Sequence, residues 1–279
     1  MARVKVGEIQ LSFEVAGDGP SVVIVNGGGA SVAQMKAIGA NHQKIIDAGY
    51  KLIRFDNRGI PPSDAPPPPY TIEQMAEDTI GLLAYLDSGP YTIVGESMGG
   101  LITQTVALKR PDLVKSAVFI AGIGNSPLFA KVFSQAYLDL LKHGEVPVSI
   151  MKALMLVVSI PPCHWDNDEV TAPVLEALSG FISASAGQTV LGHSTASCHW
   201  MTEDHLNELA GVEVPVLAIA NEFDIYFPPS FVRKAVSKLP KAEFIEIEGA
   251  PHASMNPEHR EKTVSSVLEF LSRHAGTCI

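Results

Sequence analysis

Runs composed largely of apolar residues recur along this chain with helical segments between them, and no other feature limits the fold as strongly. A run that is apolar at nearly every position predicts a strand buried on both faces, as in a parallel sheet. Such runs lie at Val22–Val25, Lys51–Phe55, Tyr91–Val94, Ser116–Ile120, Val214–Ala220 and Phe244–Ile247, after an alternating strand at Gln10–Val15 that is expected at an edge. Helical periodicity is present at Ile72–Leu86, Leu101–Lys109, Phe231–Leu239 and Glu258–His274. The sequence therefore predicts an α/β fold with a mostly parallel central sheet flanked by helices.

The series of strands is interrupted between about Asn125 and Leu209. This stretch has helix-like apolar spacing and loop punctuation, but no series of runs that predicts strands. A long segment of this kind is expected to lie over the carboxyl ends of the strands as a lid. The predicted organisation is a core domain at residues 1–124 and 210–279, with an inserted helical cap at residues 125–209.

The charge balance limits the kind of partner. The chain has 279 residues, enough for one large domain, and it carries 30 acidic against 20 basic side chains, a formal net charge of −10. A negatively charged protein repels a nucleic-acid backbone and an anionic membrane surface. We therefore expect a small-molecule substrate, with no nucleic-acid partner and no membrane partner. The sequence leaves self-association into a homo-oligomer open.

Cysteine usage and the N-terminal residues indicate the compartment. Cys163, Cys198 and Cys278 contain no C-x-x-C pair and cannot all be matched within the chain, unlike the cysteines of a disulfide-stapled secreted protein. The N-terminus enters a strand-like alternation at once, without the apolar stretch of a signal peptide. The most apolar stretch, Ala153–Ile160, is too short to span a bilayer. The expected location is the cytoplasm.

The motif that carries chemistry is Gly95-Glu96-Ser97-Met98-Gly99-Gly100, which lies between a predicted strand and a predicted helix. It is the nucleophile elbow, G-x-S-x-G, in its strand–turn–helix context. Glycines two residues before and after the serine remove side chains that would clash across so tight a turn. The serine also lies at a helix N-terminus, where free N–H groups favour developing negative charge. Ser97 is therefore the expected nucleophile.

With this elbow the chain resembles the α/β-hydrolase superfamily, and within it the lidded serine esterases and cofactor-free haloperoxidases. Asp56-Asn57-Arg58-Gly59 resembles the D-x-R-G turn of that branch, and we interpret Asp56 and Arg58 as loop architecture. The resemblance implies the chain order serine, acid, histidine, with the acid and the histidine each following a late strand. It also implies that the reaction uses no cofactor and no metal.

The acid and the base implied by this order follow the last two predicted strands. Asp224 matches the family's acid position, whereas the competitor Glu222 is two residues closer to its strand and less able to reach a histidine across the crevice. His252 matches the family's glycine-x-x-histidine turn. A serine hydroxyl is a weak nucleophile, so an imidazole must remove its proton while a carboxylate fixes the imidazole tautomer. The expected catalytic residues are Ser97, Asp224 and His252.

An oxyanion hole completes the site that the resemblance implies, with one N–H from the residue after the nucleophile and one from the loop after the third strand. These groups map to Met98 and to the loop Asn26-Gly27-Gly28-Gly29, where Gly28 is the expected donor and Gly29 the runner-up. Asn26 stands where many members have histidine, a departure that leaves the backbone donors in place. The loop lacks the glycine spacing of phosphate-binding motifs.

The tripeptide Cys-His-Trp occurs twice in the expected cap, at Cys163-His164-Trp165 and Cys198-His199-Trp200. Two thiolates and two imidazoles suit zinc, but neighbouring residues point in different directions on a helix or strand, which makes chelation awkward. We favour the interpretation that Trp165, His199 and Trp200 pack near or line an acyl pocket. Apolar cap residues that suit an apolar substrate include Met151, Leu154, Met155 and Phe181.

The leading hypothesis from these residues is hydrolysis of a carboxylic ester or thioester through an acyl-serine intermediate. Carbon–carbon bond hydrolases, cofactor-free haloperoxidases and acyl-eliminating, lyase-like enzymes of the superfamily share the same catalytic residues and remain alternatives. Serine at the elbow argues against the branches whose nucleophile is aspartate or cysteine. A non-catalytic small-molecule binder is the alternative from a different class, and covalent labelling by a fluorophosphonate probe would separate it from an enzyme.

Overall fold

This computed structural model describes residues 1–37, 42–144, 146–184 and 188–275 of the chain, apart from the side chains of residues 178–184 and 188. The strands are β1 (Ala2–Val6), β2 (Ile9–Ala16), β3 (Ser21–Val25), β4 (Lys51–Phe55), β5 (Tyr91–Glu96), β6 (Val114–Ile120), β7 (Val216–Phe223) and β8 (Ala242–Pro251). The helices are α1 (Val32–Ala37), α2 (His42–Asp47), α3 (Ile72–Leu86), α4 (Met98–Lys109), α5 (Leu128–Lys142), α6 (Val148–Ser159), α7 (Asp168–Ala184), α8 (Gln188–Thr202), α9 (Pro229–Val236) and α10 (Pro257–His274). Short 3-10 turns lie at Pro111–Leu113, Pro162–His164 and Asn207–Gly211.

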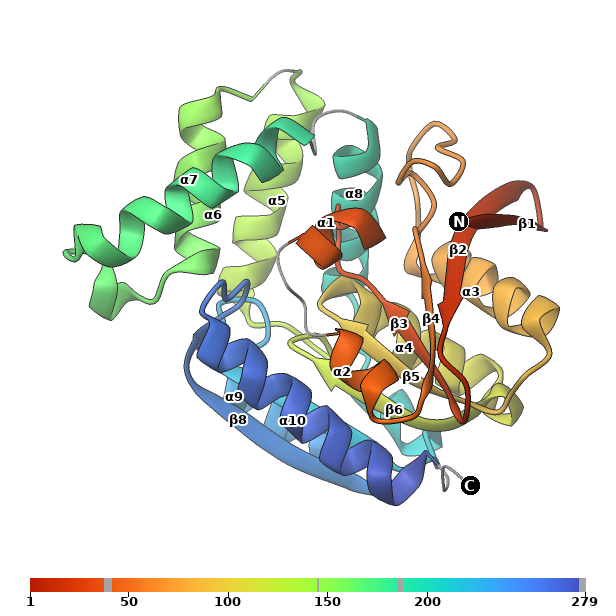
Figure 1. The fold of residues 1–279 in the computed structure, drawn as a ribbon. Helices are drawn as coiled ribbons and strands as arrows, with labels where there is room; N and C mark the ends of the chain where they lie inside the picture. Colours follow the sequence, from red (N-terminus) through yellow and green to blue (C-terminus); the bar gives the residue numbers. More distant parts are fainter. Residues whose placement is uncertain (38–41, 145, 185–187, 276–279) are drawn as a thin grey trace.

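The described strands form one sheet in the order β1-β2-β4-β3-β5-β6-β7-β8. All neighbours from β4 to β8 pair in parallel, whereas β2 pairs antiparallel with both β1 and β4. The prediction of a mostly parallel sheet flanked by helices is confirmed (Figure 1). The prediction that Gln10–Val15 is an edge strand was wrong, because Ala2–Val6 adds the antiparallel strand β1 outside it.

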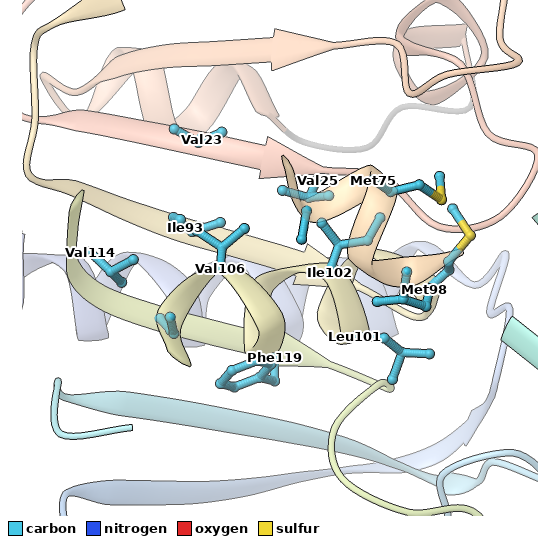
Figure 2. Packing of buried hydrophobic residues seen from close by; sticks show 14 of the residues in the cluster. Val23, Val25, Met75, Ile93, Met98, Leu101, Ile102, Val106, Val114 and Phe119 are labelled. Carbon is cyan, nitrogen blue, oxygen red and sulfur yellow. The ribbon is translucent and has the colours of Figure 1, made fainter. Parts of the chain in front are cut away.

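Helices cover both faces of the sheet, and each buried strand divides its side chains between them. On one face Val23 and Val25 of β3 belong to a core with residues of α3, α4 and α9. On the other face Val22 and Ile24 belong to a core with residues of α2 and α10. Figure 2 shows the first face, where α4 packs over β3, β5 and β6. Because side chains alternate along a strand, burial on both faces requires the continuous apolar runs that the sequence contains.

Local chemistry explains where the helices of the core begin. The Thr71 side chain accepts a hydrogen bond from the Gln74 N–H, and the Gln74 side chain accepts one from the Thr71 N–H, so a capping box starts α3. Helix α4 begins at Met98, directly after Ser97 and three residues before the predicted start at Leu101. A single residue, Ser97, therefore separates the end of β5 from the start of α4.

Between the end of β6 and the start of β7 the described chain contains helices α5 to α8 and no strand. The predicted helical insertion is confirmed. Helix α5 packs against α8, and α6 against α7. Figure 1 shows α5, α6 and α7 gathered at one end of the molecule, with α8 lying between them and the core.

The most apolar stretch of the sequence, Ala153–Ile160, lies in and just after α6, within this insertion. In the described part of the chain, no helix is both long and apolar enough to cross a membrane.

Candidate active site

Ser97 lies at the turn between β5 and α4 in a backbone conformation that few residues adopt. Its φ is 52° and its ψ is −121°, outside the regions that L-residues favour. The Ser97 N–H donates to the Ile120 carbonyl of the neighbouring strand at 2.8 Å, which holds the turn in place. A Cβ on Gly95 would collide with the Gly99 carbonyl, and a Cβ on Gly99 would collide with the Val25 carbonyl. The glycines of the motif are therefore required by close backbone approach.

A chain of hydrogen bonds joins Ser97 to His252 and Asp224. Ser97 Oγ lies 2.9 Å from His252 Nε2, and His252 Nδ1 lies 2.8 Å from Asp224 Oδ2. Since a carboxylate only accepts hydrogen bonds, Nδ1 carries the proton, and Nε2 is left to accept the serine proton. The three residues come from the ends of β5, β7 and β8, which parallel pairing brings to the same edge of the sheet.

The Asp224 carboxylate is held in one orientation. Its Oδ1 accepts hydrogen bonds from the backbone N–H groups of Tyr226 at 2.7 Å and Phe227 at 2.9 Å. The side chain has no solvent exposure, and Oδ2 is directed at His252. The two carboxylate oxygens therefore have different roles, since Oδ1 anchors the side chain and Oδ2 orients the imidazole.

Glu222, the competing acid, has a different contact. Its Oε2 accepts a hydrogen bond from the Gly249 N–H at 2.7 Å, within the turn that precedes His252. Asn221 also supports this turn, because its Nδ2 donates to the His252 carbonyl at 3.3 Å. The structure brings Asp224 to the imidazole and leaves Glu222 to stabilise the loop that carries it.

The electrostatic environment keeps His252 basic. Burial lowers the pKa of His252 because it disfavours the charged ring, but the charge and hydrogen bond of Asp224 and the charge of Glu96 outweigh burial and leave this pKa raised. Glu96 is the variable residue of the elbow, immediately before Ser97. Burial raises the pKa of Glu96, against the opposing effect of the positive charges of His252 and Arg260. A second carboxylate therefore acts on the imidazole.

The expected oxyanion donors, Gly28 and Met98, lie beside the nucleophile. Met98 is the first residue of α4, so its N–H has no acceptor within the helix. A Cβ built on Gly28 would lie 3.8 Å from Met98 Sδ, and one built on Gly27 would lie 3.3 Å from Ser97 Cβ. The glycine loop thus passes within contact distance of the serine. Gly28 and Met98 therefore remain the expected oxyanion donors.

The rest of this glycine loop is anchored by side chains from outside it. Asn57 Nδ2 donates to the Asn26 carbonyl at 3.3 Å, while Asn26 Oδ1 is buried without a partner. The Gly29 N–H donates to His193 Nδ1 at 2.9 Å. Gly29, the runner-up oxyanion donor, therefore has its N–H occupied, and Gly28 remains the expected donor of the loop.

A cavity of about 450 Å³ opens onto Ser97 and His252 and is lined by both the core and the cap. A volume of this order is typical of small-molecule sites. Leu154 is not among its lining residues, and the Phe181 side chain lies outside the described residues. The apolar cap residues that line the cavity are Met151, Met155, Val158, Ala177, Val190 and Met201.

Trp165, His199 and Trp200 are not among the residues that line this cavity, so the part of the interpretation that had them line an acyl pocket was wrong. Trp165 is 55% exposed, and its Nε1–H donates to the Ile160 carbonyl. Trp200 is buried and stacks on His205 with ring centroids 3.5 Å apart, and His199 is exposed. Helix α8 presents another stripe to the cavity, with helical spacing that excludes the tripeptide. The stripe consists of Val190, His193, Ser194, Ser197 and Met201.

The two described cysteines of the repeats also have different environments. Cys163 is exposed, whereas Cys198 is buried and its Sγ lies 3.3 Å from Gln135 Oε1. Among the residues that the structure describes, no group of three or more His, Cys, Asp or Glu side chains is placed to hold a metal ion. Cys278 lies outside the described residues.

Asp56 and Arg58 of the D-x-R-G turn have structural contacts, in agreement with their interpretation as loop architecture. Asp56 Oδ1 accepts a hydrogen bond from the Val32 N–H at 2.7 Å, and burial raises the pKa of Asp56 to about 6. Arg58 forms an ion pair with Asp78 of α3 at 2.6 Å. Neither residue is among those that line the cavity.

Three residues that the sequence did not single out meet at this site. Glu96 occupies the variable position of the elbow, and Tyr226 packs edge-on against His252 with ring centroids 4.8 Å apart. His193 reaches the glycine loop from the cap. The position of Glu96 in the motif was a usable signal, whereas nothing in the sequence distinguishes His193 from the other histidines.

A sequence profile described as the alpha/beta hydrolase fold matches residues 20–256 of the chain. The chain belongs to the alpha/beta hydrolase family. The strained serine turn, the parallel sheet and the helical insertion of this alpha/beta hydrolase are the features on which the sequence resemblance rested.

Known members similar to this alpha/beta hydrolase are named for different reactions. BpoC of Mycobacterium tuberculosis, named as a candidate non-heme bromoperoxidase, is 27% identical over 270 residues, covering 95% of this chain and 98% of BpoC. The crystal structure of BpoC aligns with a TM-score of 0.84 at 25% identity, covering 96% and 97% of the two chains. A 2-(acetamidomethylene)succinate hydrolase of Mesorhizobium japonicum is 24% identical over 273 residues, covering 96% of this chain and 94% of that protein. A thermophilic esterase from Thermogutta terrifontis shares the fold, with a TM-score of 0.78 at 22% identity and coverage of 99% and 100%.

Proposed function

We propose that this alpha/beta hydrolase cleaves a carboxylic ester, or a thioester, of a small and largely apolar substrate through an acyl-serine intermediate. The observation that carries the proposal is the chain from Asp224 through His252 to Ser97, with spacings of 2.8 and 2.9 Å. Such a chain supports nucleophilic catalysis, because one imidazole both accepts the serine proton and delivers it to the leaving group. The proposed reaction needs no cofactor and no metal.

In the acylation step, Ser97 Oγ attacks the substrate carbonyl carbon while His252 Nε2 takes the serine proton. The carbonyl oxygen becomes negatively charged and accepts hydrogen bonds from the N–H groups of Gly28 and Met98. His252 then gives its proton to the departing alkoxide or thiolate, so the alcohol or thiol leaves and the acyl group remains on Ser97. Asp224 stabilises the charged imidazole throughout, because its Oδ2 faces Nδ1–H.

In the deacylation step, water replaces the alcohol or thiol. His252 removes one proton from the water as its oxygen attacks the acyl carbon, and the oxyanion donors again stabilise the negative oxygen. Collapse of this intermediate breaks the bond to Ser97 Oγ, which recovers its proton from His252. The products are the carboxylic acid and a free enzyme in its starting protonation state.

The cavity supports an apolar acyl group. Its volume is about 450 Å³, and methionine, valine and alanine side chains of the cap are among the residues that line it. Methionine side chains adapt to irregular apolar shapes, so the cap wall suits an acyl chain of several carbons rather than a charged group. The sequence resemblance to esterases and the fold shared with a solved esterase support ester cleavage as the reaction.

A fluorophosphonate probe and a panel of p-nitrophenyl esters of graded chain length, run beside acyl thioesters, test the proposal. We expect stoichiometric labelling of the folded protein, turnover of esters that improves with acyl length and then declines, and loss of both on Ser97→Ala. Labelling that persists in Ser97→Ala would identify another nucleophile. Folded wild-type protein that neither labels nor turns over any ester would instead support a binding protein.

A further inference from the structure

His193 of the cap helix α8 makes two hydrogen bonds to separate loops of the core. Its Nδ1 accepts from the Gly29 N–H at 2.9 Å, and its Nε2 lies 2.7 Å from the Arg58 carbonyl. A backbone N–H can only donate and a carbonyl can only accept, so Nδ1 is bare and Nε2 carries the proton. The two contacts therefore define one neutral tautomer of the imidazole.

The environment of His193 maintains this neutral form. The residue is 2% exposed. Burial, reinforced by the positive charge of Arg58, lowers the pKa of His193 to about 4, against the opposing effect of its hydrogen bond to the Arg58 carbonyl. A protonated ring could not accept from Gly29, so the neutral form is the one that keeps both bonds. At neutral pH the imidazole remains a bridge between the two loops.

The rest of α8 is built to hold His193 at this place. Thr189 Oγ1, one turn earlier, donates to the Gly59 carbonyl of the same core turn. A Cβ on Gly192 would collide with the ring of Tyr70, so glycine lets the helix approach the core closely. The imidazole packs against the Tyr70 ring at a centroid distance of 6.0 Å. Gly192 and His193 lie three and four positions after Thr189 in α8, so all three contact the core from the same side of the helix.

The loop that His193 holds is the one that carries the proposed oxyanion donor. Gly28 precedes Gly29, and a Cβ built on Gly28 would lie 3.8 Å from His193 Cβ. The three glycines of this loop have little steric restriction of their own, so external contacts must set the direction of the Gly28 N–H. Donors of an oxyanion hole contribute only when they are held in position before the charge develops.

We propose that His193 is a positioning residue for catalysis: it ties the oxyanion loop to the Asp56–Gly59 turn and so orients the Gly28 N–H. The inference rests on the proposed acyl-serine reaction and extends it. It makes the cap part of the catalytic geometry as well as a wall of the substrate cavity, because the oxyanion loop is aligned only when α8 is docked.

Three substitutions at this position separate hydrogen bonding from packing. His193→Asn places an acceptor near the position of Nδ1 and keeps the Gly29 bond, although it leaves a space beside Tyr70. His193→Phe fills that space but removes both bonds, and His193→Gln keeps a donor for the Arg58 carbonyl. Thr195→Val is the matched control, because Thr195 Oγ1 donates to the Leu191 carbonyl within α8, so its loss removes a hydroxyl from the same helix without removing a hydrogen bond to the core.

We expect kcat for p-nitrophenyl esters to fall about tenfold to a hundredfold in His193→Phe with little change in KM, since removal of a donor outright costs about 10²–10³. His193→Asn should stay within about fivefold of wild type, His193→Gln should resemble His193→Phe, and Thr195→Val should keep wild-type kcat. The rate of fluorophosphonate labelling should follow the same order. A purely structural role predicts the opposite order, with His193→Phe more active than His193→Asn.

Amide hydrogen exchange of the loop tests the tie without turnover. The Gly29 amide should exchange faster in His193→Phe and remain protected in His193→Asn. Equal protection in all variants, or His193→Phe at least as active as His193→Asn, would overturn the inference. Wild-type protein whose Ser97 does not label would reject the proposed reaction, and the role of His193 in it, whatever the exchange data show about the loop.

Discussion

Replacing Asp224 with asparagine should reverse the tautomer of His252 while leaving the fold intact. In the wild type, Oδ1 accepts from the N–H groups of Tyr226 and Phe227, and Oδ2 accepts from His252 Nδ1. The two backbone donors require an oxygen, so the asparagine oxygen must occupy the Oδ1 position. Its NH₂ group is then directed at His252 Nδ1 and can only donate. Nδ1 must become the acceptor, and the ring proton moves to Nε2.

With the proton on Nε2, the imidazole can no longer accept the proton of Ser97. The backbone anchors of residue 224 are unchanged, so the loss is one of chemistry and the protein should still fold. For a carboxylate in this role, the change to asparagine lowers kcat by about 10⁴. That factor corresponds to about 5.5 kcal/mol in the activation barrier.

Steady-state hydrolysis of a p-nitrophenyl ester near neutral pH measures the effect, with thermal unfolding to verify the fold. Glu222→Gln is the matched control, because it removes the nearby carboxylate charge while an amide oxygen still accepts from Gly249. We expect Glu222→Gln to retain kcat within about threefold of wild type. An Asp224→Asn variant within tenfold of wild type, or a larger loss in Glu222→Gln, would refute the tautomer argument.

Three further predictions concern the base, the core and the cavity wall. Because the pKa of His252 is raised and the ring must be neutral to act, kcat/KM should rise with pH through a midpoint above about 6.5. Glu96→Gln should move that midpoint to lower pH, and a midpoint that stays or rises in this variant contradicts the prediction. Trp200→Ala removes the buried stack on His205 and should lower the free energy of unfolding by about 3–5 kcal/mol in a denaturant titration, with little change in KM. Unaltered stability with a changed KM would instead indicate that Trp200 contacts the substrate. Met155→Phe should shift the preferred p-nitrophenyl ester to a shorter acyl chain, and an unchanged chain-length profile would show that this wall does not contact the substrate.

The expected nucleophile could be identified from the sequence because its requirements are local. A strand, a tight turn and a helix follow one another within a few residues, and the serine conformation depends on the glycines at positions 95 and 99. The positions of Asp224 and His252 follow from the chain order that the family resemblance implies, once the last two parallel strands are recognised. The short helices α1 and α2 were not predicted, because six residues are too few to display a helical period.

The cap was predicted as a helical insertion, and Met151 and Met155 were expected at its apolar wall, but the side chains of α8 that line the cavity were not predicted. Apolar spacing identifies a helix without saying which of several surfaces its apolar face will meet. In α8 two surfaces are removed from solvent. One lines the cavity, and the other, which includes Trp200, packs against the core. The tripeptide Cys198-His199-Trp200 therefore does not mark the face of α8 that lines the cavity.

The sequence by itself determined the class of fold and the elbow, because these depend on strand periodicity and on sterics between near neighbours, and the family resemblance implied the order of the acid and the base. Only the tertiary structure decided that Glu222 supports the turn before His252, that the charge of Glu96 acts on the imidazole, and that His193 contacts the glycine loop. The residues joined by the Gly29–His193 bond are 164 positions apart. A hydrogen bond of that span depends on how the cap docks onto the sheet, and the direction of one backbone N–H leaves no periodic or compositional trace in the chain.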